Sequence, residues 1–425
     1  MRSGAPSGAS PAPDPSFSTL VHLLRVRARD QADLRGFTFL QDGETDEEHL
    51  TYAALDRKAR AIAAVLQARG AQGERALLLY PPGLDYIAGF FGCLYAGVIA
   101  VPIYPPDPLR LARTLPRLLS ISQDAQATLV LTTDLIHGMG ELLFEQAPEL
   151  RELHWLATDT LDAEVAEGWR DPGVTADTRG FLQYTSGSTS SPKGVVLTHG
   201  NLLHNSKLIH ACFGHSPQSQ GVIWLPPYHD MGLIGGILQP LYGGFPVTLF
   251  SPVDFLKRPL RWLEAISRFK ATTSGGPNFA FDLCVRKSTP EERAKLDLSH
   301  WDLAFNGAEP LMPDTLRRFA EAFGPQGFRS EAIYPCYGLA EGTLIASGGD
   351  KRQLPVQRTV DADALKEHRV VATGPTNPAA WTLVGAGRNL TDQRLIIAHP
   401  ETGRPLASGQ VGEIRVAGPS IAQGY

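Results

Sequence analysis

Cysteine is scarce in this sequence, and the four that occur form no CxxC pair: Cys93, Cys212, Cys284 and Cys336. This spacing argues against a zinc site and against a disulfide framework, and it favours a reducing, cytoplasmic location. An excess of charge of one sign is also lacking, because the net charge is only -5 over 425 residues. That balance gives no general attraction to nucleic acid or acidic lipid, so nucleic acid is not expected as a partner.

Long uninterrupted apolar runs are lacking as well. Residues 1–18 contain one arginine with no apolar run behind it, which predicts a disordered tail rather than a signal peptide. The most apolar stretch, residues 86–106, is interrupted by glycines and is followed by aspartate after two prolines. It therefore predicts a buried part of a sheet protein and no membrane span.

Helix-like and strand-like segments alternate along most of the chain. Residues 51–70 have helical periodicity, with Leu55 and Leu66 on one face, Thr51 as a candidate N-cap and Gly70 as a stop. Short apolar runs that resemble buried strands lie between this and later helices. The alternation predicts an α/β fold with mostly parallel sheets covered by helices on both faces.

The texture of the sequence divides the chain into four expected parts. These are a tail at residues 1–18, an α/β subdomain at 19–180, a similar α/β subdomain at 181–347 and a smaller β-rich subdomain at 348–425. In the last part, short strand-like runs are expected at 370–372, 381–384, 394–398 and 412–416, separated by Gly, Pro, Asp and Thr.

Residues 184–196 read YTSGSTSSPKGVV and lie between two expected strands, at 181–184 and 194–197. A Ser/Gly/Thr run is as often a plain linker as a binding loop. Yet glycine backbone amides, hydroxyl groups and the charge of Lys193 together suit a phosphate group. The segment is not a Walker A loop, since Lys193 follows a proline and precedes a strand rather than opening a helix.

Further segments allow a functional and a structural interpretation each. In LPPYHDMGLIGG, residues 225–236, His229 is either a surface histidine or a residue at the mouth of a pocket. Asp230 is either a helix N-cap or a group that orients the loop of His229. In SGGPNFAFDLC, residues 274–284, the phenylalanines belong to the core or border a ligand. In FNGAEPL, residues 305–311, a turn after a strand has backbone groups that could contact a base edge.

YPCYGLAEGTL, residues 334–344, places Tyr337 four residues before Glu341. A tyrosine ring offers a flat face for a purine, and a carboxylate is a natural ligand for Mg²⁺ that also holds phosphate oxygens. Taken alone, such a tyrosine is more often part of the core, and such a glutamate is more often solvated.

Taken together, these segments resemble the adenylate-forming superfamily of acyl-CoA synthetases, luciferases, peptide-synthetase adenylation domains and fatty acyl-AMP ligases. The resemblance covers about residue 50 to the end, and its motifs occur in the family's order: YTSGSTSSPKGVVLTH, LPPYHDMGL, NGAEPL, YGLAEGTL and GEIRVAGPSIAQGY. It implies that a carboxylate attacks the α-phosphorus of ATP to give an acyl-adenylate and pyrophosphate, and that the acyl group then passes to a thiol. Such chemistry depends on alignment and charge neutralisation.

The resemblance also implies a role for individual residues. The residues with implied catalytic roles are His229, Glu341 and Lys193. The residues implied to bind the ATP phosphates are Thr185, Ser186, Gly187, Ser188, Thr189 and Lys193. The adenine or AMP site takes Gly307, Ala308, Glu309, Tyr337, Gly338, Ala340 and Thr343. The acyl pocket takes His229, Met231, Ile234, Gly276, Asn278 and Phe279, and Mg²⁺ takes Glu341 and Thr185.

Two departures from the common pattern point to the fatty acyl-AMP ligases within the superfamily. Ala340 stands where many relatives have a threonine that contacts the α-phosphate, so Thr343 is the expected substitute. The segment between Thr343 and Gly385 is longer than CoA ligases usually have. The implied reaction is therefore ATP-dependent and Mg²⁺-dependent activation of a fatty acid, with transfer to the phosphopantetheine of an acyl carrier protein or of a polyketide or peptide synthase carrier domain.

Alternative functions remain open at this point: a long-chain acyl-CoA ligase, a peptide-synthetase adenylation domain, and a non-catalytic module that binds nucleotide or lipid. After the last motif the family continues to a ribose-binding aspartate, a hinge and a small C-terminal domain with a catalytic lysine. None of these follows in the 425 residues. The sequence is thus expected to be the N-terminal body of such an enzyme, poor at completing adenylation by itself.

Overall fold

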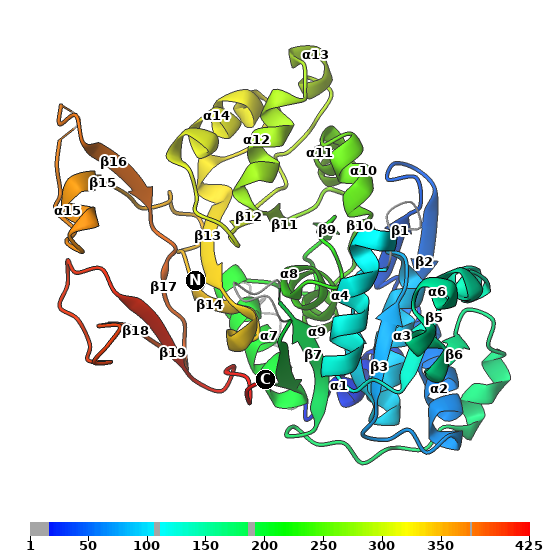
Figure 1. The fold of residues 1–425 in the computed structure, drawn as a ribbon. Helices are drawn as coiled ribbons and strands as arrows, with labels where there is room; N and C mark the ends of the chain where they lie inside the picture. Colours follow the sequence, from blue (N-terminus) through cyan, green and yellow to red (C-terminus); the bar gives the residue numbers. More distant parts are fainter. Residues whose placement is uncertain (1–16, 106–110, 186–191, 375) are drawn as a thin grey trace, which may run out of the picture.

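The computed structural model of this chain describes residues 17–105, 111–185, 192–374 and 376–425. Two helix-covered sheets form the body of the molecule (Figure 1). A smaller β-rich part from about residue 350 onward extends to one side of it (Figure 1). The predicted α/β class, with mostly parallel sheets and additional small β-sheets, is confirmed.

The first sheet has six strands. Their spatial order is β6 (His154–Ala157), β5 (Leu129–Thr132), β3 (Arg75–Leu79), β4 (Ile99–Pro102), β7 (Arg179–Tyr184) and β8 (Gly194–Thr198). All neighbours are parallel except β7 and β8. The helical elements that accompany it are α2 (Tyr52–Ala68), α3 (Leu84–Ala96), α4 (Leu111–Asp124), α5 (Asp134–Gly138), α6 (Gly140–Gln146), η2 (Pro148–Glu152) and η3 (Ala163–Gly168).

The second sheet has nine strands. Their order is β17 (Arg388–Asn389), β14 (Ile345–Gly348), β13 (Ile333–Gly338), β12 (Leu303–Asn306), β11 (Thr273–Gly276), β9 (Gly221–Ile223), β10 (Val247–Phe250), β1 (Phe37–Leu40) and β2 (Glu47–Leu50). From β13 to β1 the neighbours are parallel, and antiparallel strands close both edges.

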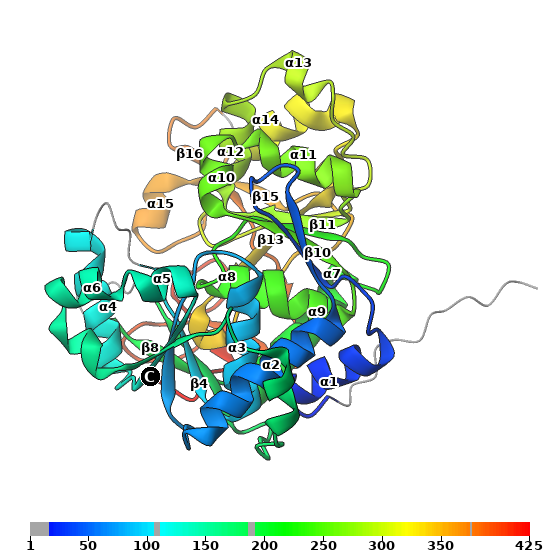
Figure 2. The same ribbon diagram turned by 90° about the vertical axis from the view of Figure 1, so that its right-hand side faces the viewer.

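Helices cover both faces of this second sheet, as the turned view in Figure 2 shows. One layer contains α10 (Pro252–Lys257), α11 (Leu260–Phe269), α12 (Asn278–Arg286), α13 (Pro290–Arg293) and α14 (Pro313–Phe323). The other contains α1 (Leu20–Asp30), α7 (His199–Phe213), α8 (Asp230–Leu233), the π-helical turn η4 (Ile234–Leu238) and α9 (Gln239–Gly243). The short 3-10 turns are η5 (Gly324–Gln326), η6 (Ser330–Ala332) and η7 (Ala340–Gly342).

Local sequence signals account for the helix predicted at residues 51–70. Its N-cap is Thr51, whose hydroxyl accepts a hydrogen bond from the backbone N–H of Ala54, and Leu55 and Leu66 are buried. Gly70 follows the helix with φ +69°, in the left-handed region that glycine tolerates best. The prediction for this helix is confirmed within about two residues at each end.

The sheets do not follow the boundary predicted at residue 180. The strands β1 and β2, from the expected first subdomain, lie at the edge of the nine-stranded sheet, while β8, from the expected second one, lies in the six-stranded sheet. Strand β1 pairs with β10 in parallel, from Phe37 with Val247 to Leu40 with Phe250. This pairing joins segments about half the chain apart.

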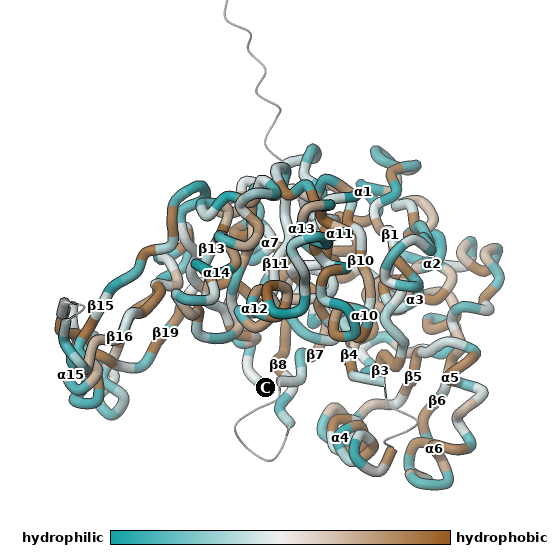
Figure 3. The backbone as a smooth tube through the Cα atoms, turned by 90° about the horizontal axis from the view of Figure 1, so that it is seen from above, coloured by the Kyte–Doolittle hydropathy of each residue, from teal (hydrophilic) through white to brown (hydrophobic). Residues whose placement is uncertain are grey.

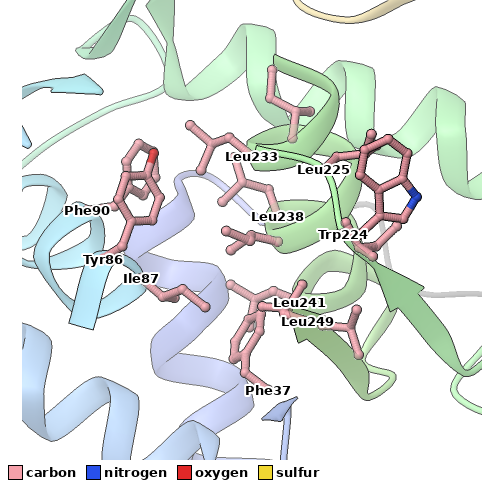
Figure 4. Close-up of a cluster of buried hydrophobic side chains, with 14 of the residues drawn as sticks. Phe37, Tyr86, Ile87, Phe90, Trp224, Leu225, Leu233, Leu238, Leu241 and Leu249 are labelled. Carbon is pink, nitrogen blue, oxygen red and sulfur yellow. The ribbon is translucent and has the colours of Figure 1, made fainter. Parts of the chain in front are cut away.

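A shared apolar core joins the two sheets. Side chains from α3 lie opposite others from α8, η4 and α9, with Phe37 of β1 close by (Figure 4). Those drawn there include Tyr86, Phe90, Leu233, Leu238 and Leu241, all at most 1% exposed. Over residues 86–103 the apolar run is therefore a buried helix and strand, as predicted, while Tyr104 is 50% exposed and residue 106 lies outside the described residues. Within the described ranges, no helix is long and apolar enough to cross a membrane.

The last part of the chain is rich in short strands. Strand β15 (Gln357–Asp361) pairs with β16 (Ala380–Val384), with α15 (Ala362–Lys366) between them, and β18 (Arg394–Ala398) pairs with β19 (Glu413–Ala417). The strand predicted at 370–372 is wrong, since only an isolated bridge from Ala372 to Val360 forms there. The tip around α15 lies away from the body and is mostly hydrophilic (Figure 3).

Candidate active site

The predicted phosphate loop connects β7 to β8, which confirms its two strand flanks. Ser186, Gly187, Ser188 and Thr189 lie outside the described residues. Of the two ends that are described, Thr185 is half-buried and its carbonyl accepts a hydrogen bond of 3.5 Å from Arg117 of α4. Lys193 is exposed, so its ammonium group is available to an anion.

Glu341, the predicted metal ligand, lies in the turn η7 beyond the end of β13. Its carboxylate accepts a hydrogen bond of 2.6 Å from the hydroxyl of Tyr425. The ammonium nitrogen of Lys193 lies 5.4 Å from the centre of the same tyrosine ring. Two residues predicted to act on phosphate and metal, 148 positions apart in the printed sequence, therefore meet at one side chain.

Residues 419–425 form a segment that holds this arrangement together, beside β8 and α7 (Figure 1). Toward β8, the N–H of Gln423 donates to the carbonyl of Val196 at 3.2 Å, and the N–H of Val196 donates to Gly424 at 2.9 Å. Toward η7, the N–H of Ala422 donates to the carbonyl of Glu341 at 2.8 Å. The segment thus ties the strand after the phosphate loop to the turn that carries the carboxylate.

Thr343, expected at the α-phosphate, lies in the interior next to segment 419–425. Its side chain is fully buried, and its hydroxyl donates a 2.6 Å hydrogen bond to the carbonyl of Ser420. Its backbone φ is +70°, an unusual conformation for a β-branched residue. The hydroxyl therefore anchors segment 419–425. Ala340 is also buried, at 5% exposure.

The predicted base-binding turn follows β12. A Cβ on Gly307 would lie 2.8 Å from the carbonyl oxygen of Cys336, so the close approach of the two strand ends requires glycine. Ala308 is exposed with φ +67°, a conformation usually avoided by non-glycine residues. Glu309 accepts a hydrogen bond of 2.6 Å from the N–H of Phe279 in the first turn of α12. This carboxylate at a helix N-terminus holds the turn in place.

A buried apolar pocket starts at Tyr337 and Gly338, next to this turn, and runs under η4 and α7. Residues from six strands and the covering helices line it: Ile209, Phe213, His215, Gly221, Ile223, Met231, Gly235, Pro240, Phe245, Val247, Thr273, Phe305, Cys336, Tyr337, Gly338, Leu344 and Ile345. An aliphatic chain suits such a lining, because nearly all of it is apolar.

Of the residues predicted for the acyl pocket, Met231 lines this pocket and the other five do not. Ile234 belongs to the core, and Gly276 packs against Trp224, since its Cβ would lie 2.9 Å from that indole. Asn278 is buried, and its side-chain carbonyl accepts a hydrogen bond from the N–H of Met312. Phe279 is 41% exposed.

His229 lines a second hollow on the other side of the loop before α8. This hollow contains two arginines and three tyrosines besides the histidine: Arg113, Arg117, Tyr104, Tyr184 and Tyr228. Partial removal from water lowers the pKa of His229, and the positive charge of Arg117 adds to this effect. The ring is thus neutral near pH 7 and can accept a proton or a hydrogen bond.

Asp230 follows His229 at the start of α8. The N-cap itself is His229, whose side chain makes no capping bond, while the carboxylate of Asp230 accepts a 2.7 Å bond from the N–H of Met231. Burial raises the pKa of Asp230, and the charge of Glu341 raises it further. Two carboxylates therefore face the same region, next to the mouth of the apolar pocket.

Comparison with known proteins agrees with this arrangement. The AMP-binding enzyme family matches residues 24–425. The chain belongs to the AMP-binding enzyme family. Among its relatives is the medium-chain-fatty-acid acyl-carrier-protein ligase JamA of Moorena producens, which is 45% identical over 414 residues, covering 97% of this chain and 70% of that protein.

Two further members extend the likeness. The long-chain-fatty-acid AMP ligase FadD32 of Mycolicibacterium smegmatis is 36% identical, over 97% of this chain and 66% of that protein. The crystal structure of a fatty acyl-adenylate ligase from L. pneumophila, solved with acyl adenylate and pyrophosphate, has a TM-score of 0.90 and 42% identity. That alignment covers 96% of this chain and 70% of the L. pneumophila chain.

Sequence reasoning missed several residues of the candidate site: Tyr425, His215, Phe245 and Thr273. The last three belong to no motif, and His215 looks like any isolated histidine. The first residues of β9, β10 and β11 line the pocket only because of the order of strands in the sheet. A weak signal existed for Tyr425 alone, since it ends the motif GEIRVAGPSIAQGY.

Proposed function

We propose that this chain is the body of a fatty acyl-AMP ligase, which activates a fatty acid with ATP for transfer to an acyl carrier protein. One observation carries the proposal: an apolar pocket opens at Tyr337, and Glu341, four residues later in the chain, meets Lys193 at the side chain of Tyr425. The carboxylate of a fatty acid whose chain lies in the pocket can thus react with a phosphate group held near Glu341 and Lys193. The fatty-acid ligases among the relatives support the same substrate class.

In the first step, a carboxylate oxygen of the fatty acid attacks the α-phosphorus of ATP. The new bond is the acyl–phosphate bond of acyl-AMP, and the bond that breaks releases pyrophosphate. Thr185 to Thr189 and Lys193 hold the β and γ phosphates, and their donors balance the charge that pyrophosphate gains. Gly307, Ala308, Glu309 and Tyr337 hold the adenine, with the tyrosine ring against its face. Neutral His229 orients the incoming carboxylate.

The residues near Glu341 fit Mg²⁺ in the form that accompanies a nucleotide. The described part of the chain has no group of three or more His, Cys, Asp or Glu side chains that could hold a metal ion alone. Magnesium in such sites commonly uses one or two carboxylates and completes its shell with phosphates and water. Glu341 provides that carboxylate, with the Thr185 hydroxyl as a second oxygen. Bound Mg²⁺ supplies positive charge to the phosphates.

In the second step, the thiol of a carrier protein's phosphopantetheine attacks the acyl carbonyl and loses its proton to water. A thioester bond forms, and AMP leaves with the electron pair of the broken acyl–phosphate bond. The proposal places this reaction in the cytoplasm. All four cysteines are free thiols, as expected in a reducing compartment.

The test is mass-spectrometric detection of acyl-AMP, using the protein that carries this chain, ATP, Mg²⁺ and a panel of fatty acids. The acyl-AMP formed is then offered to CoA and to a holo carrier protein in parallel. We expect acyl-AMP and acyl carrier protein to form, and little acyl-CoA. Equal transfer to CoA would replace the proposal with an acyl-CoA ligase. Absence of acyl-AMP, together with calorimetric binding of an acyl-adenylate analogue, would indicate a binding module.

A further inference from the structure

The apolar pocket runs along the strands of the nine-stranded sheet, from their carboxyl-terminal ends to their amino-terminal ends. Tyr337 and Gly338, at its mouth, end β13, whereas Gly221, Val247 and Thr273 are the first residues of β9, β10 and β11. Because these strands are parallel, their first residues lie at the amino-terminal end of the strands, whereas the mouth lies at the carboxyl-terminal end. The pocket therefore crosses the full height of the sheet.

The far end of the pocket is closed. Thr273, His215, Phe245 and Val247 are between 1% and 8% exposed, so no opening leads from there to solvent. His215 is held on both ring nitrogens: Nε2 lies 3.1 Å from the hydroxyl of Thr273, and Nδ1 lies 3.1 Å from the side-chain amide of Gln239. Its ring also packs 4.9 Å from that of Phe245. The end wall is thus rigid as well as closed.

The strand register gives the extent of the pocket along the strands, which bounds a chain that lies parallel to them. Thr273 pairs with Leu303, and Ala304 pairs with Ile333, so Thr273 lies level with Ala332. Tyr337 is five residues further along, which at roughly 3.3 Å per residue is about 16 Å. A carbon–carbon contact distance of about 4 Å at the closed end leaves about 12 Å for a chain. An extended chain advances about 1.2 Å per bond, which corresponds to about ten bonds.

We propose that this pocket takes a medium acyl chain of about 10 to 12 carbons, and that the wall formed by His215, Phe245, Val247 and Thr273 sets the upper limit. The inference deepens the proposed function and rests on it, since the pocket is assigned to the acyl chain of the same reaction. A rigid wall makes the limit sharp, because a longer chain has to displace a ring fixed by two hydrogen bonds.

Gly235 offers a way to shorten the pocket without disturbing the fold. It lies in the π-helical turn η4, and a Cβ there would meet only Leu344, at 3.5 Å, an ordinary contact. Both residues line the pocket. The methyl group of Gly235→Ala would therefore occupy space between mouth and end wall, while alanine is no worse than glycine in a helix.

The experiment measures the affinity of acyl-sulfamoyl-adenosine analogues with 4 to 16 carbons by calorimetry. We expect affinity to rise by roughly fourfold per buried methylene, up to 10 to 12 carbons, and to fall at least about tenfold by 16 carbons. Gly235→Ala should weaken the 10- and 12-carbon analogues about tenfold or more and spare the 4-carbon one. Val247→Ala should shift the optimum toward longer chains. Val165→Ala, at a residue 37% exposed in η3, is the matched control and should change nothing.

The outcomes test the proposed function and the chain-length limit separately. Failure of all analogues to bind would overturn the proposed function itself. Binding that is equally tight at every length, or equally affected by Val165→Ala, would leave the proposed function intact and overturn the length limit. If Val247→Ala does not fold, Gly235→Ala still decides, because unchanged binding of the 12-carbon analogue there would place the chain outside this pocket.

Discussion

The hydroxyl of Tyr425 donates a 2.6 Å hydrogen bond to the carboxylate of Glu341, while its ring lies 5.4 Å from the ammonium nitrogen of Lys193. One side chain thus spans the two charged groups proposed for metal and phosphate. Backbone hydrogen bonds to Val196 and Glu341 hold the segment on both sides. The charged groups are therefore positioned by the fold before any substrate binds, which limits the reorganisation that binding requires.

Replacement of Glu341 by glutamine should weaken binding of ATP in the presence of Mg²⁺ by about tenfold or more and leave ATP binding without Mg²⁺ nearly unchanged, because a neutral amide is a poor Mg²⁺ ligand. The fold should persist, since the amide oxygen can still accept the Tyr425 hydrogen bond. Calorimetry with and without Mg²⁺ measures both effects. Glu321→Gln, on the exposed side of α14, is the control. Equal weakening in both conditions would remove Glu341 from the metal site.

Lys193→Ala should weaken ATP binding by about 1–2 kcal/mol through loss of one charge-assisted contact. The midpoint of thermal unfolding should move by less than about 2 °C, because Lys193 is exposed. Comparison of ATP with AMP checks the assignment, since the lysine is expected to hold the β and γ phosphates only. Lys366→Ala, whose side chain is 77% exposed near α15, serves as the control. An equal loss of AMP affinity would contradict the phosphate role.

Thr343→Ala should lower the free energy of unfolding by about 1–3 kcal/mol, because the buried carbonyl of Ser420 loses its hydrogen-bond donor. Thr343→Ser keeps the donor and should recover most of that loss. Chemical denaturation of both variants measures the difference. If Thr343→Ala instead kept full stability and lost ATP affinity, while Thr343→Ser kept both, the Thr343 hydroxyl would contact the nucleotide.

Stability should decrease as the pH falls from 7 to 5. Burial lowers the pKa of His199 to about 4 and that of His215 to about 3, against about 6.5 in an unfolded chain. The unfolded state therefore binds protons first, and the stability present above pH 6.5 is lost as pH falls toward the folded pKa values. Each histidine should cost about 2 kcal/mol at pH 5.

Denaturation curves at several pH values check this, and NMR titration of the two imidazole rings identifies the groups. His199 adds a structural reason, because its Nδ1 accepts a hydrogen bond from the N–H of Leu20 and must stay unprotonated to do so. Stability that stays constant between pH 7 and 5 would show that these histidines are not held neutral.

Local patterns along the chain predicted much of the fold. The helix with its N-cap at Thr51 and the strands on both sides of the loop at 184–196 each depend on contacts within a few residues, which periodicity and capping chemistry describe. The strand expected at 370–372 did not form because the run changes partner: the N–H of Val370 donates to Gly409, whereas Ala372 forms its bridge with Val360 of β15.

Of the residues expected for the acyl pocket, only Met231 lines the apolar pocket proposed for the chain. The residues that close it, such as His215 and Val247, come from a helix end and a strand start that share no motif. Which apolar residue faces a cavity rather than the core depends on strand order and helix packing, and these follow from contacts far apart in the chain.

The sequence by itself determined the class of chemistry, through an ordered set of motifs whose residue types suit phosphate, metal and base. Only the tertiary structure decided how these groups meet. It placed β1 beside β10, brought Lys193 and Glu341 to Tyr425, turned the Thr343 hydroxyl inward and closed the pocket at His215. The physical reason is that residue type is a local property, while burial, hydrogen-bond partners and cavity length arise when distant segments pack together.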